Sequence, residues 1–180
     1  IGMDGLYVVN EAEQAILTQF GKPVGGVAEP GLHFKMPFVQ KVSRFEKRIL
    51  KWDGDPNQIP TKDKRFIWID TTARWRIKDP LLFYTTVATE RGAMSRLDDI
   101  IDSVVRDAVS GRLLVELVRG SDYEAQEGSG EERFEVEGVE VAKENLVGRE
   151  EIMAGILDKA RANTPDYGIE LLDVQIKRIN

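Results

Sequence analysis

The order of the hydrophobic patterns along the 180-residue chain predicts an α+β fold, with strands first, amphipathic helices next and one strand at the end. Apolar side chains alternate with a period of two over residues 66–77. Helical periodicity follows at about 93–109 and 149–163, and a last alternating segment covers 169–179. Such segregation predicts an antiparallel sheet with helices packed on it and a returning C-terminal strand, rather than an alternating α/β fold.

The N-terminal third is expected to form short strands. Leu6–Val9 and residues 14–20 have strand patterns on either side of the polar segment 10–13. The next stretch, 21–37, is rich in glycine and proline, which is typical of turns. Residues 38–50 then return to a strand pattern among basic side chains.

The clearest predicted strand covers Phe66–Ile77. Its even-numbered positions from 68 to 76 carry mostly polar or charged side chains, whereas its odd-numbered positions carry apolar or β-branched ones. We expect the second set to face the core: Ile67, Ile69, Thr71, Ala73, Trp75 and Ile77. This period, with β-branched and aromatic side chains, is typical of a half-buried antiparallel strand.

Asp79 and Pro80 mark the change from strand to helix. Aspartate caps helix N-termini and proline suits the first helical position, so a short helix is predicted over 81–87. A longer amphipathic helix is predicted over about 93–109, because apolar residues recur there at alternating spacings of three and four. Its stripe consists of Met94, Leu97, Ile101, Val104 and Ala108.

The C-terminal part is expected to hold another helix and the closing strand. Gly111 interrupts the long helix, and leucines within 113–117 predict a further short helical piece. The next helix covers 149–163, and Pro165 ends it. In the last strand we expect three apolar side chains to face inwards: Leu172, Val174 and Ile176.

The composition fits one domain or two small subdomains. Apolar residues make up 42% of the chain, which is enough for a core without disulfides or metals. We expect a mainly β subdomain over 1–79 and an α/β subdomain over 80–180, with an acidic insertion at about 120–147. That insertion is glycine-rich and poor in large apolar residues, which predicts a mobile segment.

Charge and cysteine content exclude several classes of function. The net charge is −6, and residues 120–151 alone contain 11 acidic and three basic residues, a net charge of −8. The nearly neutral remainder lacks the basic footprint that nucleic acids need, so no nucleic-acid partner is expected. Because cysteine is absent, a cysteine nucleophile, a thiolate zinc site, an iron–sulfur cluster and disulfides are excluded.

The sequence contains no run of about 18 apolar residues, so none of its segments is predicted to span a bilayer. No signal-peptide pattern opens the chain, and Ile1-Gly2-Met3-Asp4 does not look like a natural beginning. We therefore expect a soluble fragment of a longer protein, from which flanking segments are missing.

The sequence offers little for catalysis or cofactor binding. His33 is the single histidine and lies among turn and apolar residues, where a structural role is commoner than a catalytic one. No nucleophile elbow, phosphate-binding loop or metal-ligand spacing is present. We therefore expect no catalytic residues, no cofactor and no metal. A serine–lysine pair stays open as an alternative, because spacing does not reveal which side chains meet in the fold.

Two segments are candidate contact surfaces. The first is a basic cluster that consists of Lys41, Arg44, Lys47, Arg48 and Lys51. It is either a solvated, edge-protecting face or a surface for anionic lipid headgroups or an acidic partner. The second, residues 30–38, alternates apolar with other side chains, which is typical of a core-facing segment or of an apolar edge that dips towards a membrane.

Several segments together carry a resemblance to a known family. They are GLYVVNEAEQAI at 5–16, FGK at 20–22, EPGLHFKMPF at 29–38, FEKRIL at 45–50, TARWRIKDP at 72–80, GREEIM at 148–153 and YGIELLDVQIKRI at 167–179. In this order they resemble the stomatin/prohibitin/flotillin/HflK-HflC family, also called the SPFH or band 7 family. The resemblance covers nearly the whole chain apart from the acidic insertion.

The resemblance is strongest to the HflC branch of the family. It implies a curved antiparallel sheet and a non-enzymatic scaffold that self-associates, pairs with an HflK-like relative and regulates the membrane AAA+ metalloprotease FtsH. It also implies a missing N-terminal membrane helix, contact with membrane lipids, and a place on the periplasmic side of the bacterial inner membrane. The alternatives are a stomatin-like lipid-binding, membrane-organising domain and, less favoured by the residues, a serine-type peptidase.

Overall fold

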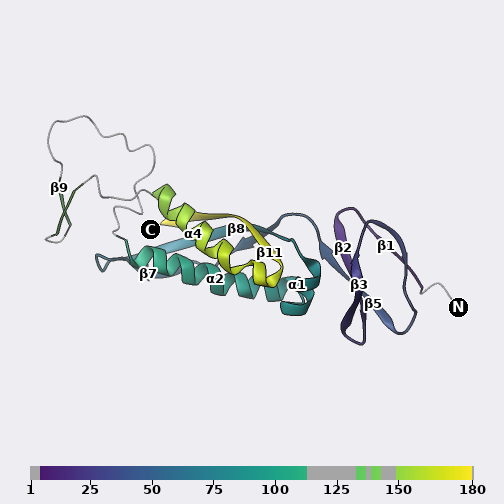
Figure 1. Cartoon of the computed structure of the whole chain (residues 1–180). Helices are drawn as coiled ribbons and strands as arrows, with labels where there is room; N and C mark the ends of the chain where they lie inside the picture. The colour runs from purple at the N-terminus through teal and green to yellow at the C-terminus, as the bar shows by residue number, and fades with distance from the viewer. Residues whose placement is uncertain (1–4, 113–132, 137–138, 143–148, 180) are drawn as a thin grey trace. The chain divides into compact units, whose positions relative to one another are not determined.

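The computed structural model describes residues 5–112, 133–136, 139–142 and 149–179 (Figure 1). The chain divides into two compact units. Unit 1 comprises residues 1–52, 74–97 and 161–173, and unit 2 comprises 53–73, 98–160 and 174–180. Five elements contribute to both units: β6 (Leu50–Asp53), β8 (Phe66–Ile77), α2 (Glu90–Ser110), α4 (Arg149–Asn163) and β11 (Ile169–Ile179). The predicted α+β class is confirmed, and the subdomain boundary near residue 79 stays a prediction.

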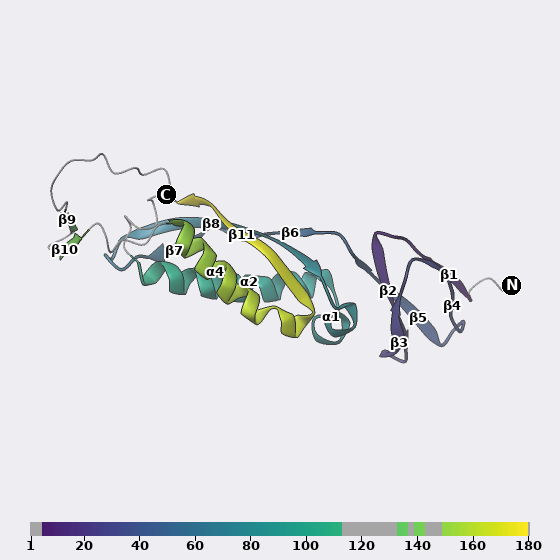
Figure 2. The same cartoon turned by 45° about the horizontal axis from the view of Figure 1, so that its top comes forward.

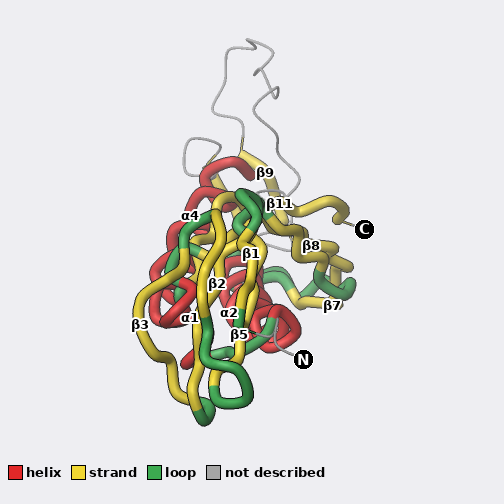
Figure 3. The backbone as a smooth tube through the Cα atoms, turned by 90° about the vertical axis from the view of Figure 1, so that its right-hand side faces the viewer, coloured by secondary structure: helices red, strands yellow, loops and turns green. Residues whose placement is uncertain are grey.

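The N-terminal part of unit 1 consists of short antiparallel strands (Figure 3). β1 (Leu6–Val9) pairs with β4 (Gly31–Phe34) in a two-stranded ribbon. In a second sheet, β2 (Glu13–Gln19) lies between β3 (Lys22–Ala28) and β5 (Gln40–Glu46). Tyr7, Val9 and Ala15 form the buried core of these strands, with Leu17, Ala28 and Val42 packed against it.

The turn-rich segment 21–37 differs from its prediction, because β3 and β4 lie inside it. The turn between β2 and β3 needs only Phe20 and Gly21, whose φ angles are 50° and 80°. Two residues with positive φ make a tight hairpin and leave the flanking residues free to pair. The strand predicted over 38–50 is also divided: β5 ends at Glu46, and β6 (Leu50–Asp53) begins after a short break.

The first turn of α1 (Pro80–Thr86) has the predicted geometry. Asp79 is the N-cap, and its carboxylate accepts a hydrogen bond from the Leu82 N–H at 3.0 Å. The cap satisfies one of the N–H groups that a helix start leaves without a partner. α1 begins at Pro80, one residue earlier than predicted.

α1 supplies the central side chain of the core of unit 1. Phe83 is fully buried, and its ring centroid lies 5.3 Å from that of Phe45 and 6.3 Å from that of Trp75. Phe45 comes from β5 and Trp75 from β8, so three elements that are distant in sequence meet at this ring. The aromatic contacts add to the area that the three rings bury.

The end of β8 is tied to the turn before β11. A short 3₁₀ helix (Pro165–Tyr167) follows α4, and Gly168 after it has a φ of 69°, in the left-handed region. The Gly168 carbonyl accepts hydrogen bonds from the Lys78 N–H at 2.9 Å and the Asp79 N–H at 3.1 Å. A Cβ at this position would lie 2.3 Å from the Asp79 carbonyl oxygen, so only glycine fits without a shift of the backbone.

In unit 2, helices α2 and α4 cover one face of a sheet (Figure 2). β8 pairs with β11, with β6 and with β7 (Asn57–Pro60), a strand that the sequence did not predict. The inward face of β8 is the predicted one, and Thr72 is buried in addition. α2 and α4 contribute seven buried apolar side chains to this unit: Ile101, Val104, Val105, Val109, Ile152, Ile156 and Ala160.

The C-terminal half adds one strand pair and corrects the predicted inward face of β11, whereas the mobility of the acidic insertion stays a prediction. Part of the acidic insertion forms a hairpin, in which β9 (Arg133–Val136) pairs antiparallel with β10 (Val139–Ala142). In β11, Leu171 is buried and Leu172 is half-buried, whereas Val174 and Ile176 are buried as predicted. The inward side therefore changes parity between Leu171 and Val174, as it does where a strand is irregular. The rest of the insertion and the helical piece at 113–117 lie outside the described residues.

Candidate functional site

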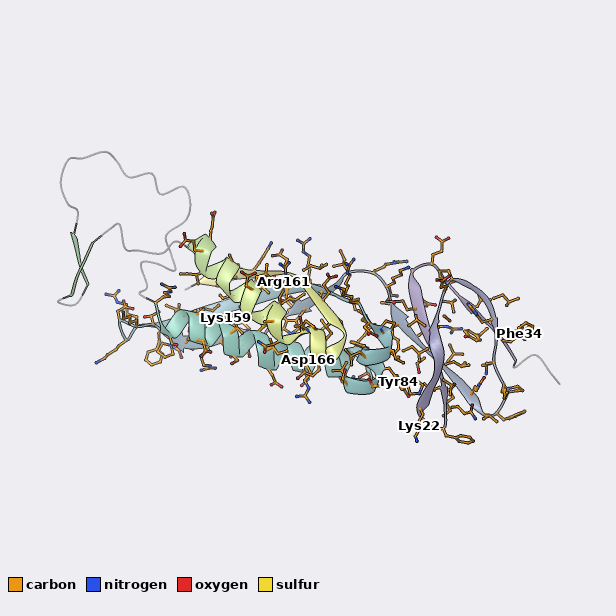
Figure 4. All side chains as sticks on the ribbon, viewed as in Figure 1. Lys22, Phe34, Tyr84, Lys159, Arg161 and Asp166 are labelled. Carbon is orange, nitrogen blue, oxygen red and sulfur yellow. The ribbon has the colours of Figure 1, made fainter. Side chains whose placement is uncertain are left out.

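The β1–β4 ribbon turns a row of apolar side chains towards solvent. Its register pairs Leu6 with Phe34 and Val8 with Leu32, and side chains alternate along a strand, so these four residues share one face. All four are exposed, Phe34 by 80%. Figure 4 shows Phe34 on the outer side of the ribbon. We call these four residues the apolar ribbon face.

The loop after β4 extends the apolar ribbon face. Met36 and Phe38 are exposed, and Phe38, at 99%, has almost no protein contact. Phe38 also has a φ of 68°, and the Met36 N–H donates to the Gln40 side-chain oxygen at 2.8 Å. Of the two readings of segment 30–38, the structure favours an exposed apolar edge over a core-facing segment. Soluble proteins seldom expose contiguous apolar side chains that have no binding partner.

The other face of the ribbon carries Tyr7 and His33. Their rings stack with centroids 5.4 Å apart, and His33 Nε2 lies 2.7 Å from the Glu29 carbonyl oxygen. Tyr7 is buried, so this face belongs to the N-terminal core. The single histidine thus makes structural contacts with its own ribbon, in agreement with the structural role expected for it.

The predicted basic cluster does not form one continuous face. Lys41 and Arg44 lie three residues apart on β5 and therefore on opposite sides of that strand. The Arg44 guanidinium donates to the Val8 carbonyl at 3.3 Å and lies 4.0 Å from the Glu13 carboxylate. The other three cations follow β5, and all are exposed: Lys47, Arg48 and Lys51. Their role as a lipid or partner surface stays a prediction.

Ion pairs connect β8 with β11 in unit 1. Arg74 contacts Asp173 at 2.9 Å, and Arg76 donates to Glu170, which Lys78 also approaches at 3.8 Å. The hydrogen bond from Arg76 lowers the pKa of Glu170 below its ordinary value. These exposed ion pairs link the two neighbouring strands and are screened by solvent, so they add little to stability.

A pocket of about 570 Å³ lies in unit 1 where α1, the end of α4 and the start of β11 meet. Leu82, Leu172 and Pro165 provide apolar lining. Both signs of charge are present, from Lys78 and Arg161 and from Asp79 and Glu170. Arg161 is already engaged: it donates to the carbonyls of Leu171 at 2.8 Å and Leu172 at 2.6 Å (labelled in Figure 4). The lining contains no serine, cysteine or histidine, so it offers neither a serine–lysine pair nor a histidine-activated nucleophile.

Within the described ranges, no group of three or more histidine, cysteine, aspartate and glutamate side chains is arranged to hold a metal ion. The Ser110 hydroxyl donates to the Asp107 carbonyl at 3.5 Å. None of the helices in the described part of the chain is long and apolar enough to cross a membrane.

Sequence reasoning missed one exposed surface, on the β7–β8 hairpin. Phe66 and Trp68 are exposed on β8. The alternating pattern had placed Trp68 on the outward face without any role and had assigned Phe66 to neither face. The available signal was an aromatic residue on the predicted solvent face, two positions after another aromatic residue. Because β7 was not predicted, the sequence did not show that this part of β8 belongs to a hairpin with one exposed face.

Comparison with known proteins defines the class of protein. Residues 7–180 match the model of the SPFH domain / Band 7 family, and the chain belongs to that family. Among curated relatives, it is 38% identical to protein HflC of Borreliella burgdorferi and 37% identical to protein HflC of Treponema pallidum, over 97% and 96% of the chain. It is 32% identical to the modulator of FtsH protease HflC of Escherichia coli K12, over 97% of the chain.

These matches cover a little more than half of each relative. The chain spans 55% of the Borreliella and Treponema proteins and 58% of the Escherichia coli protein. The similarity therefore concerns the SPFH domain, and what the whole relatives do comes to this chain only as a proposal.

Proposed function

We propose that this chain is the SPFH domain of an HflC-like scaffold subunit that regulates an FtsH-like membrane protease and has no catalytic activity of its own. The observation that carries the proposal is the similarity to proteins named HflC over 96–97% of the chain, one of them named as a modulator of FtsH protease. In this proposal the subunit assembles with copies of itself and with an HflK-like relative. The assembly regulates the protease by restraining it sterically rather than by catalysing a reaction.

The apolar ribbon face supports a position at a membrane surface. Burying apolar area in lipid contributes about 25 cal/mol per Å², so four exposed apolar side chains give useful but reversible binding. Met36 and Phe38 would enlarge the contact. We propose that the domain lies on the periplasmic side of the bacterial inner membrane, held by a membrane helix outside these 180 residues, with the ribbon face dipping into the lipid interface.

Multivalency explains how weak contacts of this domain give a stable assembly. A shared membrane raises the effective concentration of neighbouring subunits, so contacts that are weak in solution become sufficient between tethered copies. The isolated domain is therefore expected to be monomeric or weakly associated, and light scattering that gave a large, tight oligomer would contradict this part.

Affinity purification from membranes tests the partners. The full-length protein is extracted gently with native flanking segments, and mass spectrometry identifies what accompanies it. Recovery of an HflK-like relative and an FtsH-like protease is the expected result. A protein that is recovered alone, or with copies of itself only, would favour a stomatin-like membrane-organising role instead.

Co-sedimentation with vesicles tests the lipid contact. Vesicles of phosphatidylethanolamine and phosphatidylglycerol are mixed with the domain, and the double variant Leu32→Ser/Phe34→Ser is expected to bind at least about tenfold more weakly, because two apolar anchors are lost. Phe20→Ser, another exposed apolar residue, serves as the matched control. Equal binding of the double variant and the wild type would rule out the ribbon face. Charge reversal at Lys47 and Arg48 tests the basic cluster in the same assay.

A further inference from the structure

The β7–β8 hairpin of unit 2 exposes an aromatic face that the proposed function does not use. Its register pairs Pro60 with Phe66 and Gln58 with Trp68, which places these four residues on one side of the hairpin. All four are exposed, Phe66 by 66% and Trp68 by 50%. We call this set the aromatic hairpin face.

The opposite side of the hairpin is packed on α2. Ile59 and Ile67 are paired there and buried. Asn57, on the same side, donates its amide to the Asp102 carboxylate of α2 at 3.1 Å. The hairpin is therefore anchored through one face, and the aromatic hairpin face points away from the helix. Exposed aromatic side chains on an anchored strand are available for binding at little cost in conformational entropy.

The turn of the hairpin is ordered and basic. Thr61 donates to Asp63 at 2.5 Å and accepts from the Arg65 N–H at 3.3 Å, and the Arg65 guanidinium lies 3.5 Å from the Asp63 carboxylate. The Asp63 side chain is 5% exposed, so its charge is turned inwards, whereas Lys62 and Lys64 are exposed. We call the three cations of this turn, Lys62, Lys64 and Arg65, the basic tip.

We propose that the aromatic hairpin face and the basic tip form a docking surface for the acidic segment 120–151 of a neighbouring copy of this chain. That segment carries 11 acidic and three basic residues. The basic tip supplies the opposite charge, which steers association and sets orientation. Phe66 and Trp68 supply rigid apolar area, the property that makes aromatic residues common binding anchors.

A backbone contact places the basic tip beside Arg112, the last described residue before the acidic segment. The Lys62 N–H donates to the Arg112 carbonyl at 2.9 Å, so the basic tip lies beside the point from which the chain continues towards its acidic segment. In a side-by-side assembly of membrane-tethered copies, the same end of each domain lies at the same height. This inference rests on the proposed lateral assembly, which would bring the acidic segment of one copy close to the basic tip of the next.

The tryptophans provide a direct readout. The chain has three, of which Trp52 and Trp75 are buried and Trp68 is exposed, so acrylamide quenching reports mainly on the docking surface. The probe is a synthetic peptide of residues 120–151, titrated into the 180-residue chain at low salt. Docking is expected to reduce the quenching of Trp68, and about 0.5 M NaCl is expected to abolish the protection, because the Debye length shortens to a few ångströms.

Variants identify the surface. Lys62→Glu/Lys64→Glu is expected to weaken peptide binding at least about tenfold, because two attractions become repulsions. The matched control is Lys22→Glu/Lys159→Glu, which reverses two exposed lysines elsewhere and is expected to retain binding (Figure 4). A peptide with its glutamates changed to glutamine controls for charge. Thermal unfolding of each variant shows that the fold is intact.

Three outcomes would overturn the inference: no protection of Trp68 by the peptide, equal binding by the Lys62→Glu/Lys64→Glu variant, or equal binding by the neutral peptide. If the peptide has no effect but removing residues 120–147 from the chain increases Trp68 quenching, the occupant is the chain's own segment and the neighbouring-copy assignment is wrong. Purification of the full-length protein with an HflK-like relative tests the proposed function separately, so each can fail without the other.

Discussion

Phe34 and Phe83 show how two parts of unit 1 treat the same side chain. Phe83 lies on α1 with no exposed surface, against rings from β5 and β8. Phe34 ends β4 with 80% of its surface exposed, paired across the ribbon with Leu6. Both regions are well supplied with apolar residues, but the side of the ribbon on which Phe34 lies has no described element to bury it.

The number of layers explains this difference. A two-stranded ribbon has two faces, and the β1–β4 ribbon uses the face with Tyr7 and Val9 for the core. No described element covers its other face, so the apolar residues there stabilise the fold less than buried ones do. Apolar area that is exposed with little benefit to folding is more simply explained by binding. The comparison therefore separates side chains that hold the fold together from side chains that are available to a partner.

The largest expected effect comes from the buried ring. Phe83→Ala removes contacts with two aromatic rings and leaves a cavity, which costs about 3–5 kcal/mol of unfolding free energy. Phe34→Ala is expected to cost less than about 0.5 kcal/mol, because its side chain is mostly in water. Urea unfolding followed by circular dichroism measures both. Similar losses of unfolding free energy for the two variants would show that Phe34 stabilises the fold as much as Phe83 does, which would contradict the comparison.

Glycines sharpen the same comparison. Gly168→Ala places a methyl group against the Asp79 carbonyl at a residue with positive φ, so we expect a loss of about 2–3 kcal/mol. Gly25 in β3 also has positive φ, at 82°, but has open space around it, so Gly25→Ala should cost only about 1 kcal/mol. Thermal melts of the two variants give the difference, and a tolerant Gly168 would mean that this turn is not tightly packed.

Two arginines offer a smaller contrast. Arg161 donates to two backbone carbonyls of β11 at 2.8 and 2.6 Å, whereas Arg44 makes one bond of 3.3 Å to Val8. We expect Arg161→Ala to cost about 1–2 kcal/mol, because it leaves both carbonyls without this charged donor. Arg44→Ala should cost less than about 0.5 kcal/mol. Chemical denaturation tests both, and Arg161→Lys should recover only part of the loss, since a lysine cannot reproduce the planar fork.

The smallest expected effect is a dependence on pH. Burial raises the pKa of Asp102 above its ordinary value of 3.8, and the nearby Asp98 and Asp55 act in the same direction, whereas the hydrogen bond from Asn57 and the charge of Arg106 oppose it. The folded state therefore binds the proton more tightly, and stability falls as the pH rises from 3.8 through the folded pKa.

A variant in which residue 102 cannot ionise tests the direction of this pH dependence. Asp102→Asn should stabilise the domain by a few tenths of a kcal/mol at neutral pH, a small value because the carboxylate is partly solvated. The gain should disappear as the pH is lowered below about 3.8. Asp107→Asn, at an exposed position of the same helix, is the control. A constant difference between Asp102→Asn and the wild type at every pH would contradict the assignment.

The sequence was most informative where one face of an element is buried. β8 and α4 have the predicted bounds, because each buries an uninterrupted apolar stripe and therefore leaves a clear period. β3 and β4 were missed because their strands are short, mostly exposed and bounded by glycine or proline, so they leave no such period. In β11 the period itself changes, between Leu171 and Val174.

The candidate surfaces were harder to predict than the fold. The alternation of residues 30–38 was visible, but whether it faced a core depended on which strand paired with β4 and on what covered the pair. The basic cluster was visible as composition, but Lys41 and Arg44 separate to opposite sides of β5. Surfaces depend on pairing between distant segments, which a single sequence does not contain.

The contact between Gly168 and the end of β8 has a consequence for the order in which the protein is made. The N–H groups of Lys78 and Asp79 both reach the Gly168 carbonyl, so the junction that leads into α1 lacks its backbone partner until residue 168 has been synthesised. During translation the ribosome releases residues 78 and 79 long before that partner emerges. The strand-to-helix junction of unit 1 therefore matures only after nearly the whole domain has left the exit tunnel, which makes late folding a property of its topology.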